Sequence, residues 1–216
     1  MAWIISYLSV VSPLPGILFG LSGKNKLSKS ARIILILMLL SFASDIILLI
    51  TGKLLKMNNM PVIHAYGLVH GVLLLLFFRE LFSRRTAIIN ALLLAFVIFY
   101  IGDSFWITGL GRPNTISQTL LNFLTISLCV AYFYRIYVDE TDIFIERSPD
   151  FIIVLGFLFY ATGAFFSWLL STDILTVSNP GDQFYGSWIL HNIANIMKNI
   201  IFAVALWKAR KTLTLN

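Results

Sequence analysis

Seven long apolar stretches constrain this chain more than any other feature. Each has about 20 residues, the number that an α-helix needs to cross the hydrocarbon core of a bilayer. No water reaches the backbone there, so a spanning segment must satisfy its own hydrogen bonds as a helix. The predicted spans are residues 2–22, 32–52, 61–83, 86–108, 115–137, 150–172 and 186–208.

The composition and the connections agree with this prediction. Hydrophobic residues make up 58% of the chain and charged residues 12%, about half the charged fraction of a soluble domain. No connection is long enough for a second domain, so residues 1–216 are predicted to form one all-α, polytopic membrane domain. The single cysteine, Cys129, excludes an internal disulfide. No basic residue precedes the first apolar stretch, which favours a retained helix over a cleaved signal peptide.

Basic residues are distributed unevenly between the two sides of these spans. One side has 12 of them and the other has 3, and Lys198, inside the last span, completes the total of 16. By the positive-inside rule the N-terminus is predicted to lie outside and the C-terminus in the cytoplasm. The 12 are Lys24, Lys26, Lys29, Arg32, Arg79, Arg84, Arg85, Arg135, Arg147, Lys208, Arg210 and Lys211, and the 3 are Lys53, Lys56 and Arg112.

The last span carries a stripe of polar residues along one face. At 100° per residue these positions fall within an arc of about 120°, and the opposite face is apolar. The stripe consists of His191, Asn192, Asn195, Lys198 and Asn199.

Other spans have matching stripes, which predict a polar cavity in the outer half of the bilayer. Ser41, Ser44 and Asp45 share one face of the second span, and Tyr66 and His70 share one face of the third. Two glycines in the third span, Gly67 and Gly71, have the spacing that lets a neighbouring backbone approach. The further members are Tyr100, Asp103 and Ser104; Gln118, Asn122, Thr125, Cys129 and Tyr132; and Gly156, Tyr160, Ala164, Ser167 and Ser171.

Asp45 and Lys198 are the two ionisable residues that are hardest to place in hydrocarbon. A charged group at such depth costs several kcal/mol unless it is paired. We therefore expect Lys198 to face the bundle interior with Asp45 as its partner, either directly or through water. Asp103 is the next candidate partner, and a purely structural pair is the alternative.

Two seven-helix families are compared and set aside. A lysine in the last span is the layout of microbial rhodopsins, but Ala194 stands where that family has an acid, four residues before Lys198. The ceramidase and progestin-receptor superfamily has an H-xxx-H pair in its last helix, whereas this chain has His191 and Asn195. Neither a metal nor a cofactor is therefore predicted.

Two further resemblances are retained. The segments "LLSFASDIILL", "YGLVHGVLLLLFF" and "GFLFYATGAFFSWLL" are similar in order to patterns of the lysoplasmalogenase family of membrane hydrolases. That resemblance implies Asp45 as general base, assisted by His70 or His191. The stretch "FLFYATGAFFSWLL…WILHNIANIMKNIIFAVALWKARK" resembles small polytopic proteins of Bacteroidota-type bacteria, which implies a bacterial inner-membrane location and no particular activity.

We predict a cavity that binds an anionic small molecule or lipid head group, in a sensor or transport component. Lys198 and His191 would supply positive charge and Asp45 the counter-charge. A lipid hydrolase using Asp45, His70 and His191 is the second interpretation, and a structural subunit is the third. No nucleic-acid motif occurs, and any protein partner would bind the basic cytoplasmic loops. The remaining predicted ligand-binding residues are Asn192, Asn195, Asp103, Gln118 and Asn122.

Overall fold

The computed structural model describes residues 2–23, 27–139, 147–169 and 180–212; most of these residues are helical and none of them lies in a strand. Seven helices in the described part of the chain are long and apolar enough to cross a membrane. The all-α, multi-pass prediction is therefore confirmed. The helices are α1 (Ala2–Val11), α2 (Leu14–Ser22), α3 (Lys29–Leu49), α4 (Met60–Leu81), α5 (Thr86–Gly102), α6 (Thr115–Asp139), α7 (Pro149–Leu169) and α9 (Pro180–Thr212).

Local sequence explains several helix boundaries. Pro13 has no backbone N–H to donate, and the first span is divided at this point into α1 and α2. Ser28 caps α3, its hydroxyl accepting a hydrogen bond from the Ala31 backbone at 3.2 Å. Two spans end in π-helical turns, η2 (Ile50–Leu54) after α3 and η4 (Asp103–Ile107) after α5. The predicted end of the sixth span, residues 170–172, lies outside the described residues.

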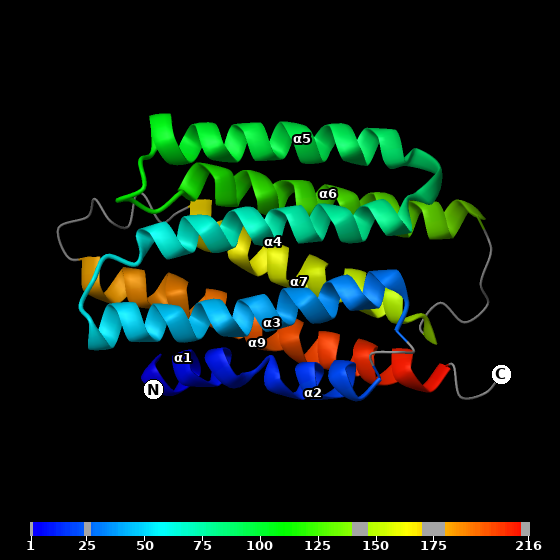
Figure 1. Ribbon diagram of the computed structural model, residues 1–216, viewed down its shortest axis with the longest axis horizontal. Coiled ribbons are helices and arrows are strands. Elements are labelled where there is room, and N and C mark those ends of the chain that lie inside the picture. The colour runs from blue at the N-terminus through cyan, green and yellow to red at the C-terminus, as the bar shows by residue number, and fades with distance from the viewer. Residues whose placement is uncertain (1, 24–26, 140–146, 170–179, 213–216) are drawn as a thin grey trace.

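The helices run up and down in one bundle (Figure 1). Helix α5 lies at one edge and packs mainly on α4, and α1 with α2 lies at the opposite edge. Helix α9 packs against α7, α1 and α2, so the last span lies between the first span and the rest of the bundle. The start of α1, the end of α3 and the starts of α4, α6 and α9 all meet at the same end of the bundle.

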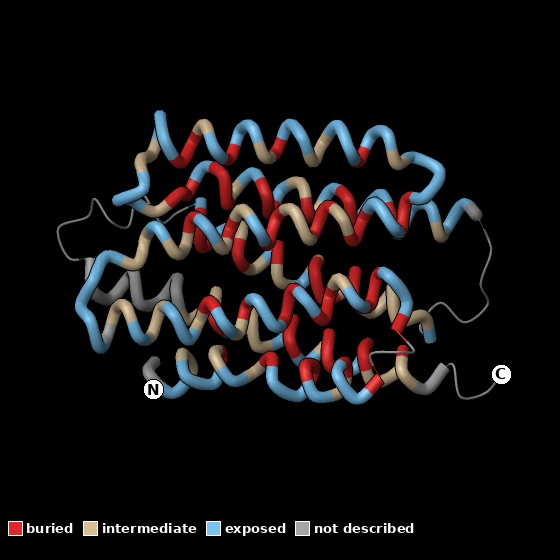
Figure 2. Tube along the Cα trace, in the orientation of Figure 1, coloured by how far each residue is buried: buried red, intermediate tan, exposed pale blue. Residues whose placement is uncertain are grey.

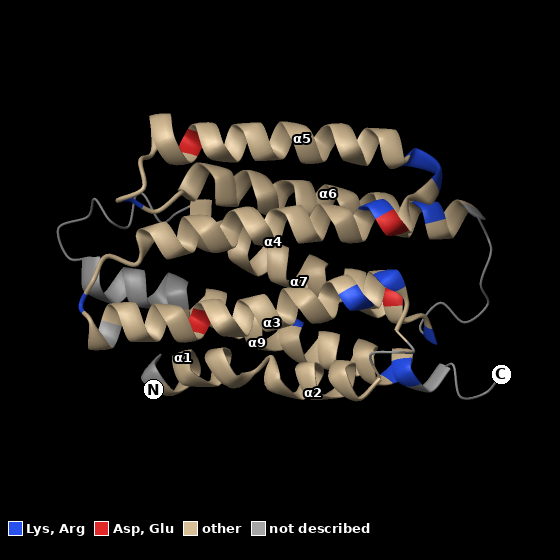
Figure 3. Cartoon of the chain, viewed as in Figure 1, with Lys and Arg blue, Asp and Glu red and all other residues tan. Residues whose placement is uncertain are grey.

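Basic residues gather at the other end of the bundle, where the chain ends (Figure 3). The short 3-10 turn η3 (Ser83–Arg85) joins α4 to α5 at this end and carries two arginines. The uneven distribution of basic residues read from the sequence is thus an uneven distribution between the two ends of the folded bundle.

The basic half of the bundle has an apolar, aromatic core. Phe77, Phe78, Phe157 and Phe202 are fully buried in it. The ring centroids of Phe157 and Phe202 are 4.9 Å apart, and those of Phe77 and Phe157 are 5.5 Å apart. Exposed positions lie on the outward faces of the helices (Figure 2), and many of these are large apolar residues, as expected for a lipid-facing surface.

Candidate functional site

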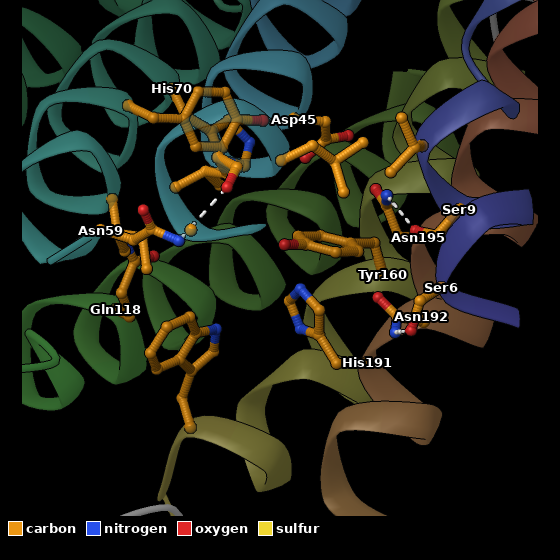
Figure 4. A pocket seen from close by; sticks show the side chains of 17 residues that line it. Ser6, Ser9, Asp45, Asn59, His70, Gln118, Tyr160, His191, Asn192 and Asn195 are labelled. Atoms are coloured by element: carbon orange, nitrogen blue, oxygen red, sulfur yellow. Dashed lines mark hydrogen bonds between the residues drawn. The ribbon is translucent and has the colours of Figure 1, made fainter. Parts of the chain in front are cut away.

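A polar cavity of about 500 Å³ lies in the half of the bundle opposite the basic end. Six α-helices supply its walls, so the site exists only in the assembled bundle. Figure 4 shows the side chains pointing into this space from α3, α4, α6, α7 and α9, with α1 closing one side. The lining residues are Ser6, Ser9, Val10, Asp45, Leu48, Leu49, Gly52, Asn59, Ile63, Tyr66, His70, Gln118, Tyr160, Trp168, His191, Asn192 and Asn195.

Six of the residues predicted for the site line this one cavity. They come from four helices and are separated by up to 150 positions in the chain. In the sequence they were grouped by helical phase and by depth in the bilayer. The six are Asp45, His70, Gln118, His191, Asn192 and Asn195. The predicted residues Lys198, Asp103 and Asn122 are not among the lining residues.

Asp45 is the acidic residue of the lining. It is half-buried on α3, next to the buried Ser41 and Ser44 of the same predicted stripe. No hydrogen bond to its carboxylate comes from the part of the chain that the structure describes. The carboxylate therefore faces the cavity with its hydrogen-bonding capacity unused by the protein.

An aromatic wall, formed by Tyr66, His70, Tyr160, His191 and Trp168, runs along the cavity. Tyr66 stacks on His70 with ring centroids 5.6 Å apart, and His70 lies 6.2 Å from Tyr160. Tyr160 in turn meets the edge of His191 at 5.6 Å, and His191 meets Trp168 at 6.1 Å. Five rings from three helices thus form a continuous series of aromatic contacts within one polar site.

Lys198 lies directly behind this wall and faces the bundle interior, as the stripe predicted. It is only 1% exposed. Its Nζ atom lies 4.3 Å from the centre of the Tyr160 ring, which is the geometry of a cation–π contact. Its charge acts electrostatically on Asp45, but the two described residues form no direct ion pair. The ring of Tyr160 is therefore its nearest stabilising group.

Asparagines of α9 form a ladder with serines of the first span. The side-chain amide of Asn192 donates to the Ser6 hydroxyl at 3.2 Å, and that of Asn195 donates to Ser9 at 2.9 Å. A third rung joins Asn199 to Ser12 at 2.8 Å. These bonds use the amide nitrogens of Asn192 and Asn195 and leave their side-chain carbonyl oxygens able to accept hydrogen bonds.

Gln118 of α6 packs closely against Gly67 of α4, together with Tyr100 of α5. Its Nε2 atom donates to the Tyr100 hydroxyl at 3.4 Å, and Asn114 donates to the same hydroxyl. A Cβ atom at Gly67 would collide with both Tyr100 and Gln118, and one at Gly71 would collide with a neighbouring aromatic ring. The two glycines were predicted to let a neighbouring backbone approach, but the atoms that lie nearest to them belong to side chains of neighbouring helices.

Asp103 and Asn122 have partners elsewhere. Asp103 is fully buried and accepts hydrogen bonds from the Ser117 backbone at 3.2 Å, the Ser117 hydroxyl at 2.5 Å and the Thr108 hydroxyl at 2.5 Å. This places a carboxylate at the N-terminus of α6, where the helix dipole stabilises negative charge. Asn122 donates to the Gln118 carbonyl at 2.9 Å within its own helix.

His64 has a similar structural position. Its two ring nitrogens lie 2.8 Å from the Ser104 hydroxyl and 2.9 Å from the Arg112 carbonyl oxygen. It thereby joins α4 to the turn after α5 and is not a lining residue.

Sequence reasoning did not anticipate the contribution of the first span. Ser6, Ser9 and Ser12 recur every three residues, and this spacing was the available signal for a polar face. Trp168 and Asn59 were also missed, since each lies at a helix end where periodicity carries little information.

The described residues contain no group of three His, Cys, Asp or Glu side chains arranged to hold a metal ion. The chain matches no family model, no curated protein and no solved structure. The cavity and its lining residues are therefore the basis for any inference about function.

Proposed function

We propose that this protein binds an anionic small molecule or lipid head group in the polar cavity, as a sensor or transport component of a bacterial inner membrane. The observation that carries the proposal is the cavity itself. Its volume of about 500 Å³ is in the usual range for ligand sites. Ionisable side chains within a membrane-spanning bundle mark binding sites and transport pathways more often than they serve packing.

The positive charge of Lys198 favours a negatively charged ligand. Its ammonium lies behind Tyr160, yet its charge acts on His70, His191 and Asp45, all of which line the cavity. Within a membrane-spanning bundle, where the dielectric constant is lower than in water, such a field attracts a negatively charged group across an intervening ring. A phosphate is the anion that we expect.

The orientation of the cavity follows from the basic end of the bundle. We propose that this end faces the cytoplasm, by the positive-inside rule, and that the cavity therefore faces outward. A cytoplasmic partner protein would then bind the basic loops, and the cavity would be reached from the outer leaflet or the periplasm.

The binding proposal is tested by filling the cavity with a side chain. Val10 lines the cavity, whereas Leu8 on the same helix is exposed to lipid. A bound ligand at about 100 times its Kd raises the free energy of unfolding by about 2.7 kcal/mol. We expect short-chain phospholipids or glycerol phosphate to raise the Tm of the wild type and of Leu8→Trp, but not that of Val10→Trp.

Either of two results would contradict this proposal. One is a wild-type protein whose Tm responds to none of these compounds. The other is a Val10→Trp variant that is folded and keeps the full response.

A second candidate function is lipid hydrolysis. The observation that favours it is that Asp45, His70 and His191 line the same cavity, since a carboxylate and two imidazoles can activate water. If the purified protein turns over a lipid, Asp45→Asn should lower kcat by about 100-fold or more, because the amide cannot act as a base. Asp150→Asn, at the start of α7, is the matched control. Full activity in Asp45→Asn would exclude Asp45 as the base.

A further inference from the structure

We propose that the ligand also carries an organic ammonium group, primary or quaternary, held between the Asp45 carboxylate and the rings of Tyr66 and Tyr160. This inference rests on the proposed function, because it assumes that the cavity binds a ligand. It adds a second chemical group, an ammonium, to the anionic group of the ligand.

The Asp45 carboxylate is the first reason. It lines the cavity, and no hydrogen bond to it comes from the described residues. A half-buried carboxylate with unused acceptor sites can accept hydrogen bonds from a donor, or attract a cation, that enters the space before it. Lys198 does not fill that role, because its Nζ atom lies over the Tyr160 ring.

The aromatic wall is the second reason. Aromatic faces attract ammonium groups, and several rings beside a carboxylate form a site that favours ammonium over neutral groups. This wall already holds one ammonium, that of Lys198, at 4.3 Å from the centre of Tyr160. Tyr66 and Tyr160 both line the cavity, so they are placed to meet a ligand from within it.

His70 provides an independent sign of a ligand. It is nine-tenths buried and lines the cavity, and its Nε2 atom has no hydrogen-bond partner among the described residues. A polar atom left in this state inside a bundle needs a partner that the protein itself does not supply. A ligand that fills the cavity would supply it.

Charge balance then defines the ligand class. Asp45 and Lys198 offset each other, so an ammonium ion alone would leave the site with excess positive charge. A ligand that carries both an ammonium and a phosphate keeps the site neutral. The ethanolamine-phosphate and choline-phosphate groups have this chemistry, either on a membrane lipid or as free molecules.

The experiment compares head groups on the full-length wild-type protein in a non-ionic detergent. Four lipids with identical acyl chains are titrated and read by native mass spectrometry: phosphatidylethanolamine, phosphatidylcholine, phosphatidylglycerol and N-acetyl-phosphatidylethanolamine. We expect the first two to bind about tenfold more tightly than the last two, which lack the ammonium charge. The N-acetyl compound keeps the phosphate and the chains, so this comparison needs no variant protein.

Two variants test whether Asp45 is responsible for the preference for lipids that carry an ammonium group. Asp45→Asn should reduce the preference for the ammonium lipids to about twofold or less, because the amide no longer attracts a cation. Asp150→Asn makes the same chemical change outside the cavity lining and should keep the preference. Displacement by free phosphocholine would identify a soluble ligand, and resistance to it would identify a lipid head group; both results support the proposal.

The experiment distinguishes a failure of the ammonium inference from a failure of the binding proposal. Equal binding of all four lipids, lost in Val10→Trp, would overturn the ammonium inference and leave the binding function in place. Tighter binding of phosphatidylglycerol would do the same. Absence of saturable binding by every lipid and by phosphocholine would overturn both proposals.

Discussion

Lys198 and Asp45 have different environments within the bundle. Lys198 is buried against the ring of Tyr160, whereas Asp45 is half-buried and lines the cavity. Each carries charge within the membrane-spanning region, and they act on each other without a direct ion pair. Removal of one charge leaves the other buried with less compensation, which destabilises a protein by about 3–5 kcal/mol when the pair is in direct contact. Their separation should make the effect smaller.

The first prediction concerns this pair. In a double-mutant cycle of Asp45→Asn and Lys198→Met, we expect each single variant to lower the Tm in detergent. The double variant should recover part of the loss, with a coupling free energy of about 1 kcal/mol. Strictly additive losses would show that the two charges are independent, and Lys198 would then depend on Tyr160 or on a bound anion.

The second prediction concerns the ring that holds Lys198. Tyr160→Phe keeps the aromatic face below Nζ, whereas Tyr160→Leu removes it. We expect the Leu variant to lose about 2 kcal/mol more stability than the Phe variant, because a desolvated cation–π contact has about this strength. Thermal unfolding in detergent measures the difference. The prediction is wrong if the two variants unfold at the same temperature.

At the scale of elements, the ladder between α1 and α9 determines where the first span lies. Its three rungs join Ser6, Ser9 and Ser12 to asparagines of α9. The outward face of α1 is exposed and apolar, and Ser12 and Pro13 separate α1 from α2. Helix α1 therefore depends on these hydrogen bonds more than a helix embedded on all sides, and it closes one side of the cavity.

The third prediction tests this dependence. An interhelical hydrogen bond in a membrane is worth about 0.6 kcal/mol, so replacement of all three serines by alanine should cost about 2 kcal/mol. Hydrogen exchange should rise in α1 and remain low in α4. Ser127→Ala is the control, since the Ser127 hydroxyl bonds to the Phe123 carbonyl within its own helix at 3.0 Å. Unchanged exchange in α1 of the triple variant would mean that packing alone holds the helix.

At the scale of the whole molecule, the two ends of the bundle differ in charge and in content. Basic side chains gather at one end, next to the aromatic core, and the polar cavity lies toward the other. By the positive-inside rule, this asymmetry predicts the orientation of the molecule in the membrane.

The fourth prediction is the orientation of the protein in the membrane, with the C-terminus in the cytoplasm. A reporter that is active only in the cytoplasm should be active when it is fused to the C-terminus and inactive when fused to the N-terminus, because 12 basic residues lie on the C-terminal side. Expression is checked by immunoblot for both fusions. A silent C-terminal reporter on a well-expressed protein would reverse the orientation and place the cavity toward the cytoplasm.

The sequence alone determined the seven spans and the inward face of most helices. Both follow from physics that acts along a single helix: the bilayer fixes the length, and the exclusion of polar groups from lipid fixes the phase. For this reason the whole stripe from Gln118 to Tyr132 is buried, and Lys198 was correctly placed inside the bundle. The same periodicity located six lining residues of the cavity.

Only the tertiary structure decided which inward-facing polar groups line the cavity and which form hydrogen bonds to neighbouring helices. Asp45 and Asp103 look alike in the sequence, yet one faces the cavity and the other accepts three hydrogen bonds near the start of α6. Helical phase specifies a direction toward the interior, but it contains no information about which neighbouring helix lies there. The serine ladder and the contact of Lys198 with Tyr160 depend on the packing of α1 and α7 against α9, and that packing is set by many side chains acting together.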